Sequence, residues 1–521
     1  MIIDLNSVAA PEEVSADVLI IGAGTCGLVV AQRLVMAGKS VAILEAGGLT
    51  QDAETHPFNE VVQLGQTYKG AEDGRFRCMG GTSTRWGGAM LPFTSWDLDR
   101  PDTGWKDAKW PVTLDAFLAY VPELEALFGL PQDRYDFPEI LEQATGGEGG
   151  FIARLAKWPP FKQRNVATLL SDFIVSDKVR IWINATATGF ELTGNGRLAS
   201  VTARNAAGAT LRVKADETLI CAGAIESTRI LLLLDRQHDD RLFATDDVLG
   251  RYFYDHLSCP TAHLDVHDAT ALNRITGFRF QGKAMRNLRF EASERTRTEH
   301  RLPAAFAHIG FATETPTGFD ALRDVFRKLQ KRQSPGAGDI VALMQASPWL
   351  AKAVWWRFIE QRLLFPDKAQ FDVHMVVEQE PVARNRITLS PDRVDPYGQA
   401  IACIDWRVGE ADVENSLGLT RQFMDAWRAS RLAPLADISE LPREGIERAI
   451  IDGGGIFHPG GTVRMGVDRQ AGVVDANLRT FAVPNLSVAS TAVFPSGGAA
   501  NPTMMLLLAG LRWADHVARA A

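Results

Sequence analysis

Short apolar runs flanking a stretch of helical spacing open the chain. Asp17–Ile21 and Val41–Leu44 are continuous apolar runs of the length that buried strands show. Between them, Leu28–Ala37 has apolar positions at helical spacing, and Gly38 follows as a C-cap. This order of strand, glycine turn, helix and strand predicts one βαβ unit near the N-terminus.

The pattern changes further along and predicts a second kind of structure. Residues 181–220 alternate apolar and polar positions between glycine turns, which predicts an antiparallel meander. Residues 318–366 look helical and are rich in Trp and Arg, and 371–407 return to strand patterns. Asn501 is predicted to cap a last helix that runs to about residue 519, because Pro502 suits a first helical turn. The whole predicts an α/β portion joined to an α+β portion.

Composition excludes several classes of protein. With 521 residues, 46% hydrophobic and 23% charged, the chain is neither disordered nor fibrous. Its net charge of −8, without a basic block, argues against nucleic acid as a partner. The five scattered cysteines form no CxxC pair, so we expect neither a disulfide framework nor a metal site. The longest apolar runs fall short of the ~18 residues that a membrane span needs.

A glycine fingerprint occupies the turn of the predicted βαβ unit. Gly22 allows the tight turn, Gly24 lets the backbone approach a pyrophosphate, and Gly27 lets the helix pack on the strand. The helix N-terminus offers free N–H groups to that pyrophosphate. Glu45, at the end of the second strand, is placed to accept hydrogen bonds from ribose hydroxyls. The motif predicts a dinucleotide but does not separate NAD from FAD.

Two further glycine-rich clusters carry candidate chemistry. Gly80–Gly88 combines four glycines with three hydroxyls and Trp86, and is either a loop pressed against a flat ring or a flexible surface loop. His458 lies in His-Pro-Gly-Gly-Thr, and a free imidazole pKa of ~6.5 suits it to take a proton from an alcohol. Asn501 starts a helix whose positive end would stabilise an anionic reduced flavin.

With these motifs, the chain resembles the glucose–methanol–choline (GMC) family of FAD-dependent alcohol oxidoreductases over nearly its full length. The blocks that carry the resemblance, in order, are Gly22–Glu45, Gly80–Gly88, Cys221–Ile230, Gly250–His256, Glu378-Gln379, Asn385–Ser390, Asp405–Arg407 and the segment from His458 to Pro502. The family's catalytic pair, a His in H-x-x-G-T and a later His or Asn, matches His458 and Asn501, which are 43 residues apart.

The resemblance implies a role for each residue of the site. His458 is the base that accepts the hydroxyl proton, Asn501 orients the carbinol, and hydride passes to flavin N5. Gln379 and Arg384, in the substrate-domain sheet, are candidate substrate contacts. The residues implied to bind FAD are Gly22, Gly24, Gly27, Glu45, Ala46, Gly80, Gly81, Ser83, Thr84, Trp86, Gly87, Ala187, Ala222, Gly223, Asn501, Pro502 and Thr503.

Departures from the family pattern refine the expectation. The loop Ser83–Trp86 looks like the pyranose-oxidase loop in which a His is bonded to the flavin, but Arg85 stands there and cannot form that bond. We therefore expect non-covalent FAD. Asn501, and Ser490 before the Phe-Pro turn, are similar to the pyranose-oxidase and bacterial sugar-dehydrogenase branch. This predicts oxidation of a ring secondary hydroxyl, at sugar C3 or C2. The alternatives are a sterol, an aromatic or an amino-sugar primary alcohol, or a flavin-fold lyase without redox turnover.

The implied architecture is a Rossmann-like FAD-binding domain (1–95, 165–260 and 450–521) interleaved with a substrate domain that contains an antiparallel sheet (96–164 and 261–449). The expected electron acceptor is oxygen, a quinone or a redox protein. Association with a small subunit and formation of a homo-oligomer are both open alternatives. The N-terminal residues show no export signal. This favours the cytoplasm, with co-export beside a signal-bearing subunit as the alternative. The Trp- and Arg-rich segment 318–366 is either a lid over the substrate pocket or a docking face for a protein or membrane.

Overall fold

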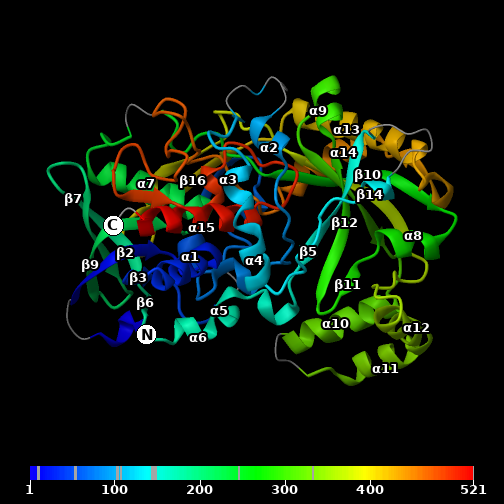
Figure 1. The fold of residues 1–521 in the computed structure, drawn as a ribbon, viewed down its shortest axis with the longest axis horizontal. Coiled ribbons are helices and arrows are strands. Elements are labelled where there is room, and N and C mark those ends of the chain that lie inside the picture. Colours follow the sequence, from blue (N-terminus) through cyan, green and yellow to red (C-terminus); the bar gives the residue numbers. More distant parts are fainter. Residues whose placement is uncertain are drawn as a thin grey trace.

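A largely parallel sheet forms one half of the protein in a computed structural model (Figure 1). The structure describes residues 1–8, 12–51, 56–100, 105, 108–141, 149–243, 247–330 and 334–519. The strands of this sheet, in spatial order, are β1 (Ile2–Asp4), β6 (Val179–Ile183), β3 (Val41–Leu44), β2 (Glu12–Ile21), β9 (Thr210–Ile220), β8 (Leu198–Arg204) and β7 (Thr186–Leu192), with β18 (Leu486–Val488) also paired to β9. Only the pairs β7–β8 and β8–β9 are antiparallel.

Three long helices cover this parallel sheet. They are α1 (Thr25–Met36), α7 (Ala224–Gln237) and α15 (Thr503–Arg519). The inner strands are buried on both faces, as their unbroken apolar runs predicted, with Leu19, Ile43 and Leu219 fully enclosed. Helices α1 and α15 pack together, so the two ends of the sequence meet in one core. Shorter helices line its border: α2 (Ser95–Asp99), α3 (Asp115–Leu118), α4 (Val121–Leu127), α5 (Val166–Leu169) and α6 (Ser171–Ile174).

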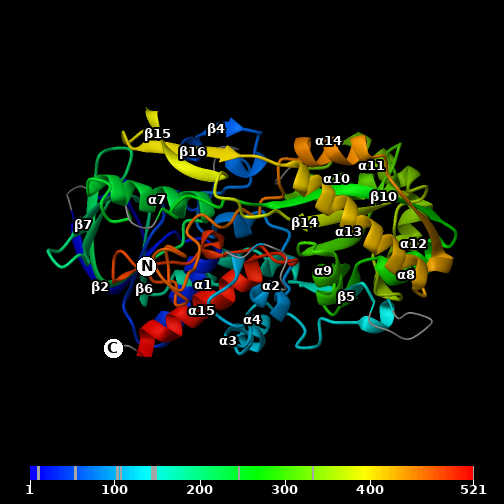
Figure 2. The same cartoon turned by 90° about the horizontal axis from the view of Figure 1, so that it is seen from above.

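An antiparallel sheet forms the other half (Figure 2). Its strands run β11 (Arg279–Gln281), β12 (Ala284–Ala292), β13 (Ala305–Ala312), β14 (Gln370–Glu378), β10 (His256–Val266) and β17 (Ala436–Glu440), and β5 (Phe151–Trp158) pairs with β12. One face packs on α13 (Glu410–Ala429) through Phe290, Phe423 and Trp427. Its other helices are α8 (Ala269–Thr276), α9 (Glu294–His300) and α14 (Arg443–Gly453). The opposite face is therefore left for the site described below.

Two smaller units complete the fold. A three-stranded sheet pairs β15 (Arg386–Val394), β16 (Ala400–Trp406) and β4 (Val61–Gly65). Helices α10 (Gly318–Gln330), α11 (Ala337–Gln345) and α12 (Ser347–Phe358) lie beside β11, far from the parallel sheet (Figure 1). Among the residues that the structure describes, none of the helices combines the length and the apolar character needed to cross a membrane.

The predicted α/β plus α+β fold class is confirmed, as are the βαβ unit, the meander and the helical segment. The domain bounds stay a prediction. One prediction is wrong: Asn501 does not cap the last helix. Helix α15 begins at Thr503, and the first helical hydrogen bond runs from Leu506 N to the Pro502 carbonyl. The Asn501 side chain instead bonds to Arg289 and His458, so it belongs to the site described below.

Candidate active site

The glycine turn between β2 and α1 is built by close backbone contacts. A Cβ on Gly22, whose φ is +110°, would lie 2.6 Å from the Cys221 carbonyl oxygen. One on Gly27 would lie 2.1 Å from the Gly22 oxygen. A Cβ on Gly24 would meet nothing closer than 3.9 Å, and α1 starts directly after it without a side-chain cap. The turn is therefore packed behind and open in front, where the N–H groups of the helix are available.

Glu45 holds this turn together. Its side chain is buried, and its two oxygens accept the N–H groups of Ala23 and Gly47, both at 2.9 Å. Burial raises the pKa of this carboxyl, and the two backbone hydrogen bonds act against that rise. Each oxygen keeps a second lone pair, so the predicted bond to a ribose is compatible with this arrangement but stays a prediction.

The second glycine loop packs directly on the first. Gly80 N donates to the Ala23 carbonyl at 2.8 Å, and a Cβ on Gly81 would lie 2.9 Å from Gly24 Cα. Ser83 is buried and bridges the loop to Val166, through bonds to Gly80 O and from Val166 N. These contacts argue against the alternative of a flexible surface loop.

The side chains of several predicted cofactor residues form hydrogen bonds within the protein. Trp86 Nε1 donates to Arg164 O at 2.6 Å, and Thr84 Oγ1 donates to Gly81 O at 2.8 Å. What these positions offer a cofactor is therefore mainly backbone. Gly87 is exposed at the end of the loop.

The remaining predicted cofactor positions surround the same turn. Ala46 follows Glu45, whose carbonyl accepts the Ala185 N–H two residues before Ala187. Ala222 follows the end of β9. Gly223, with φ +76°, has open space where a Cβ would stand. A cradle of glycines with open front positions and an uncapped helix end fits the pyrophosphate of a dinucleotide such as FAD.

Gly24→Ala is expected to fold and to lose FAD. The new methyl group has room in the protein but occupies the space where a pyrophosphate would approach. Gly27→Ala is the contrasting variant, because its Cβ would collide with the Gly22 oxygen and distort the turn itself. Flavin content per folded chain, with circular dichroism as the check of folding, separates the two. A Gly24→Ala protein that retains full FAD would contradict the placement of the pyrophosphate.

His458 and Asn501 meet although they come from different segments. His458 Nε2 and Asn501 Nδ2 are 3.2 Å apart. Arg289, which was not predicted, donates from Nη2 to Asn501 Oδ1 at 2.7 Å. This bond orients the amide so that its NH₂ group faces the imidazole. Nε2 therefore accepts from Asn501, so it carries the lone pair of a neutral base at this point of the site.

Asp255 anchors the backbone on which His458 stands. Its Oδ1 accepts the N–H groups of His256 (2.6 Å) and His458 (2.9 Å), and its Oδ2 accepts the Tyr68 hydroxyl at 2.7 Å. The ligand atoms of Asp255, His256 and His458 lie within 4.8 Å of one another, a spacing that a metal ion could use. Because the carboxylate already accepts three hydrogen bonds and His256 Nε2 lies 2.8 Å from Gly498 O, hydrogen bonding accounts for this cluster.

The surroundings keep His458 neutral. Burial lowers its pKa well below 6.5, and the nearby His256 and Arg289 lower it further. A neutral imidazole is the form that accepts a proton, so the electrostatics match the role that the resemblance implies.

A row of basic and imidazole side chains crosses the antiparallel sheet beside this pair. Arg154 on β5 lies opposite Arg289 on β12, and His308 on β13 lies opposite His374 on β14. The register of Phe290 with Ala307 brings Arg289 next to His308. His308 and His374 are partly exposed although they lie mid-sheet, so this face borders open space. The signal for Arg289 was present in the Arg-Asn-Leu-Arg-Phe-Glu-Ala alternation of 286–292, which places charge on one face of a strand.

Glu378, also unpredicted, ties the loop before Asn501 to the rest of the site. It is buried, forms an ion pair with Arg100 at 2.8 Å, and accepts the N–H groups of Gly497 (2.7 Å) and Gly498 (3.1 Å). Burial alone raises the pKa of a carboxyl, but Arg100, with smaller contributions from Arg297 and His256, more than offsets this, and the pKa of Glu378 is lowered. The carboxylate thus stays charged and holds the loop.

The two candidate substrate residues lie away from the pair. Gln379 is buried, and its amide contacts Trp406 Nε1 (2.8 Å) and Arg407 O (2.9 Å), so its polar atoms are already used within the protein. Arg384 is exposed near Gly409. The structure does not bring either of them to His458.

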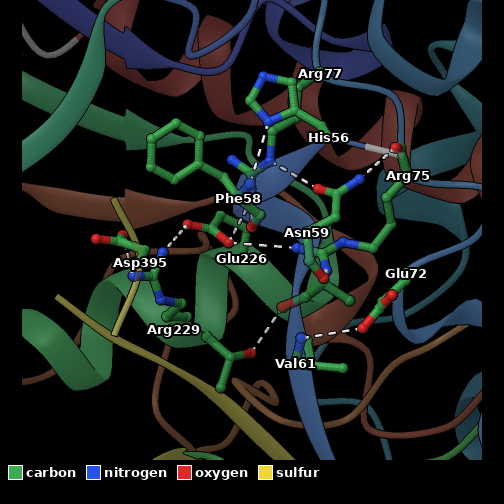
Figure 3. A network of polar contacts seen from close by, with 12 residues as sticks. His56, Phe58, Asn59, Val61, Glu72, Arg75, Arg77, Glu226, Arg229 and Asp395 are labelled. Carbon is green, nitrogen blue, oxygen red and sulfur yellow. Dashed lines mark hydrogen bonds and ion pairs between the residues drawn. The ribbon is translucent and has the colours of Figure 1, made fainter. Parts of the chain in front are cut away.

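A buried charge network is centred on Glu226 (Figure 3), which lies three residues after Gly223 in the chain. Glu226, in the first turn of α7, accepts from Arg77 (2.7 Å), Arg229 (2.9 Å) and Arg75 (3.4 Å). Burial raises the pKa of Glu226, but Arg77, Arg229 and Arg75 together more than offset this and lower it to about 2. Arg229 also forms an ion pair with Asp395, which lies in the loop between β15 and β16. The network joins α7 to two segments distant in sequence.

Comparison with known proteins gives three findings. The family described as GMC oxidoreductase matches residues 381–510. The chain is 24% identical to 2-methyl-1,2-propanediol dehydrogenase of Mycolicibacterium austroafricanum, covering 96% of this chain and 95% of that protein. It is 22% identical to the fructose dehydrogenase large subunit of Gluconobacter japonicus, covering 97% of this chain and 98% of that protein.

Solved structures agree on the fold. A crystal structure of formate oxidase is 18% identical and superposes with a TM-score of 0.58, covering 98% of this chain and 99% of that one. A structure of an R554A variant of formate oxidase from Aspergillus oryzae, studied for FAD modification, gives the same TM-score of 0.58 at 16% identity and covers 97% of this chain and 98% of that one.

Proposed function

Because this chain belongs to the GMC oxidoreductases and is an FAD-dependent alcohol oxidoreductase, we propose that it oxidises a ring secondary hydroxyl of a sugar or glycoside, at C3 or C2, to a ketone. The observation that carries the proposal is the pairing of a neutral His458 with an oriented Asn501, 3.2 Å apart. The polar row of Arg289, His308 and His374 beside the pair suits a substrate with several hydroxyls.

His458 acts as the base. Its Nε2 takes the proton from the substrate hydroxyl, which replaces the Asn501 NH₂ group as its hydrogen-bond partner. The Asn501 NH₂ group then donates to the same substrate oxygen and fixes the direction of the carbinol C–H bond. FAD, when bound, supplies the acceptor for the hydride that leaves the carbinol carbon. Asp255 and Glu378 hold the two loops so that this geometry needs little rearrangement.

The FAD is proposed to be dissociable. Arg85 is exposed, and its guanidinium lies 5.7 Å from the Phe76 ring. A guanidinium does not form the covalent bond to a flavin that the histidine of the pyranose-oxidase loop forms. Acid precipitation of the holoenzyme should release all of the flavin into the supernatant. Flavin that stays with the precipitate would contradict this part of the proposal.

Anaerobic flavin bleaching across a substrate panel tests the function. The panel contains D-glucose, D-galactose and their methyl glycosides, a 1,2-diol, an aromatic alcohol and a sterol. We expect bleaching with at least one sugar or glycoside, at a higher second-order rate than with any other alcohol. The diol is the informative competitor, because a full-length relative is named as a diol dehydrogenase. Faster reduction by the diol would overturn the sugar assignment, and no bleaching with any alcohol would overturn redox turnover.

The pH dependence of reduction should carry the signature of a depressed imidazole pKa. Since burial, His256 and Arg289 all lower the pKa of His458, the base stays neutral well below pH 6.5. The second-order rate of flavin reduction is therefore expected to be flat between about pH 6 and 8 and to fall only at lower pH. Stopped-flow absorbance across this range measures it. An acidic limb centred at or above pH 6.5 would contradict a neutral His458 with a lowered pKa.

A further inference from the structure

Arg289 is a buried cation without a counter-ion. Its side chain is 3% exposed, and among the described residues it forms no ion pair. Only Nη2 has a partner, Asn501 Oδ1, while Nε and Nη1 are buried without one. Its remaining close contact is the Phe306 ring, 4.0 Å from the guanidinium carbon. A buried charge and two unsatisfied donors are costly unless something else satisfies them.

The charged neighbours do not neutralise Arg289. Glu291 lies two residues along the same face of β12 and attracts it, but its ion pair, at 2.7 Å, is with Arg154. Arg154 is opposite Arg289 in the sheet, and it forms ion pairs with both Asp136 and Glu291, each at 2.7 Å, so Glu291 is engaged there and not with Arg289. On the other side stand His308 and His374, and the positive charge of Arg289 helps to lower the pKa of His308 to about 3, after burial as the main cause.

From this we infer that Arg289 binds a carboxylate of the substrate while Asn501 contacts the reacting carbinol, which makes the substrate a sugar acid. The inference rests on the proposed function for the oxidation of a substrate hydroxyl, whereas the binding of the carboxylate is argued from Arg289 alone. A carboxylate offers two acceptor oxygens in the plane of a guanidinium fork, and Nη2 forms such a fork with Nε on one edge and with Nη1 on the other. Asn501 uses one Nη2 hydrogen, so the second Nη2 hydrogen and the unpartnered nitrogen on its edge are the donors for the carboxylate. Nη2 keeps its bond to Asn501, so one side chain holds the anion and orients the catalytic amide.

Matched pairs of sugars test this inference. D-glucuronate and D-galacturonate differ from D-glucose and D-galactose only in carrying a carboxylate at C6. For the wild-type holoenzyme, we expect the second-order rate of flavin reduction to be higher with each uronate than with its parent sugar. In Arg289→Gln, the uronate-to-sugar ratio should fall about 100-fold. The ratio cancels any loss that acts through Asn501, since this affects both sugars alike.

Arg286→Gln is the matched control. Arg286 is a buried arginine on the same strand, but it pairs with Asp133 and Arg134 O, away from Asn501. Its loss should leave the ratio unchanged. An unchanged ratio in Arg289→Gln, or an equal fall in both variants, would overturn the inference and leave Arg289 as a residue that positions Asn501.

A binding measurement separates this inference from the proposed function. Acetate cannot be oxidised as an alcohol, so its titration against the oxidised holoenzyme, followed by the flavin absorbance, reports the anion site alone. We expect saturable binding that weakens about 100-fold in Arg289→Gln and is retained in Arg286→Gln. Equal acetate affinity in wild type and Arg289→Gln would overturn the anion site even if sugars bleach the flavin. Acetate binding without sugar turnover would instead overturn only the sugar substrate.

A separate surface, on α11 and α12, carries a second inference. Met344, Trp355 and Phe358 are 70%, 58% and 65% exposed, and Ile340, Val341, Val354 and Ile359 are exposed as well. On its other side, α12 buries Trp349 and Trp356 against Phe319 and Leu322. The exposed apolar side chains are thus not needed for this small core. A contiguous apolar surface of this kind is unfavourable in water and marks an interaction site.

The charge around this surface favours one occupant. The described residues of this segment, 318–330 and 334–366, contain six basic and four acidic side chains, although the whole chain carries a net charge of −8. Apolar side chains that include Trp, set among basic residues on short helices, match the chemistry of an anionic lipid surface. We propose that α11 and α12 rest on an anionic membrane, inserting Trp355 and Phe358 without crossing it.

Vesicle flotation tests the membrane proposal. The holoenzyme should float with vesicles of phosphatidylcholine mixed with phosphatidylglycerol, and less with phosphatidylcholine alone or at high salt. The double variant Trp355→Ser, Phe358→Ser should bind about tenfold more weakly while reducing flavin at the wild-type rate. Absence of flotation, or equal flotation of the variant, would overturn it. So would a dimer in solution that the same variant dissociates, since a second copy would then cover this surface.

Discussion

His458→Ala is expected to fold, bind FAD and reduce the flavin about 10³-fold more slowly than the wild type with the best substrate of the panel. The variant removes the only imidazole that contacts Asn501 within the described residues, and with it the acceptor for the hydroxyl proton. FAD binding should survive because the glycine cradle lies on β2, α1 and α7, whereas His458 stands on a separate loop. Anaerobic stopped-flow reduction and flavin content measure the two effects.

His267→Ala is the control for His458→Ala. His267 follows β10 and is exposed beside Asp437, 3.1 Å away, with no part in the site. It should reduce flavin like the wild type. A His458→Ala enzyme that also reduces at a near wild-type rate would remove His458 from the role of base.

Glu226→Gln is expected to cause the largest loss of stability, about 3–5 kcal/mol. The neutral amide leaves Arg75, Arg77 and Arg229 in one buried cluster with Asp395 as the single remaining carboxylate partner among the described residues. Because Glu226 lies near Gly223, FAD binding should weaken together with the fold. Urea unfolding of the apo and holo forms, followed by circular dichroism, measures the change.

The sign of the pH effect on Glu226 follows from its lowered pKa. Its value of about 2 in the folded protein lies below the 4.5 of a free carboxyl, so its contribution is present above pH 4.5 and is lost as the pH falls through about 2. The wild type should therefore lose urea resistance in this window more steeply than Glu226→Gln. Glu13→Gln is the control, since Glu13 pairs with Lys214 at the exposed surface and should change little. Equal unfolding midpoints for the two variants would contradict the role of the network.

The parts of the site that could be predicted are those in which backbone geometry restricts the residue type. The fingerprint glycines were recognisable because Gly22 and Gly27 stand where a Cβ would strike a carbonyl oxygen. The unbroken apolar runs of β2 and β3 indicated a parallel sheet because strands buried on both faces leave no polar positions. Both signals are local, so the sequence displays them directly.

The parts that could not be predicted depend on contacts between distant segments. Asn501 looked like a helix cap, yet its amide is taken by Arg289, 212 residues away. Gln379 looked like a substrate contact, yet Trp406 and Arg407 use its amide. A polar side chain has several chemically adequate partners, and only packing decides which of them is within reach.

The sequence by itself therefore determined the FAD cradle, the fold class and the identity of the His458 and Asn501 pair as candidates, because each is written in a short motif. The tertiary structure decided what surrounds that pair: the Asp255 and Glu378 anchors, and a strand that brings the uncompensated charge of Arg289 to the Asn501 amide. Burial is the physical reason, since it raises the cost of an unpaired charge and depends on every segment that excludes water, not on the residue that carries the charge.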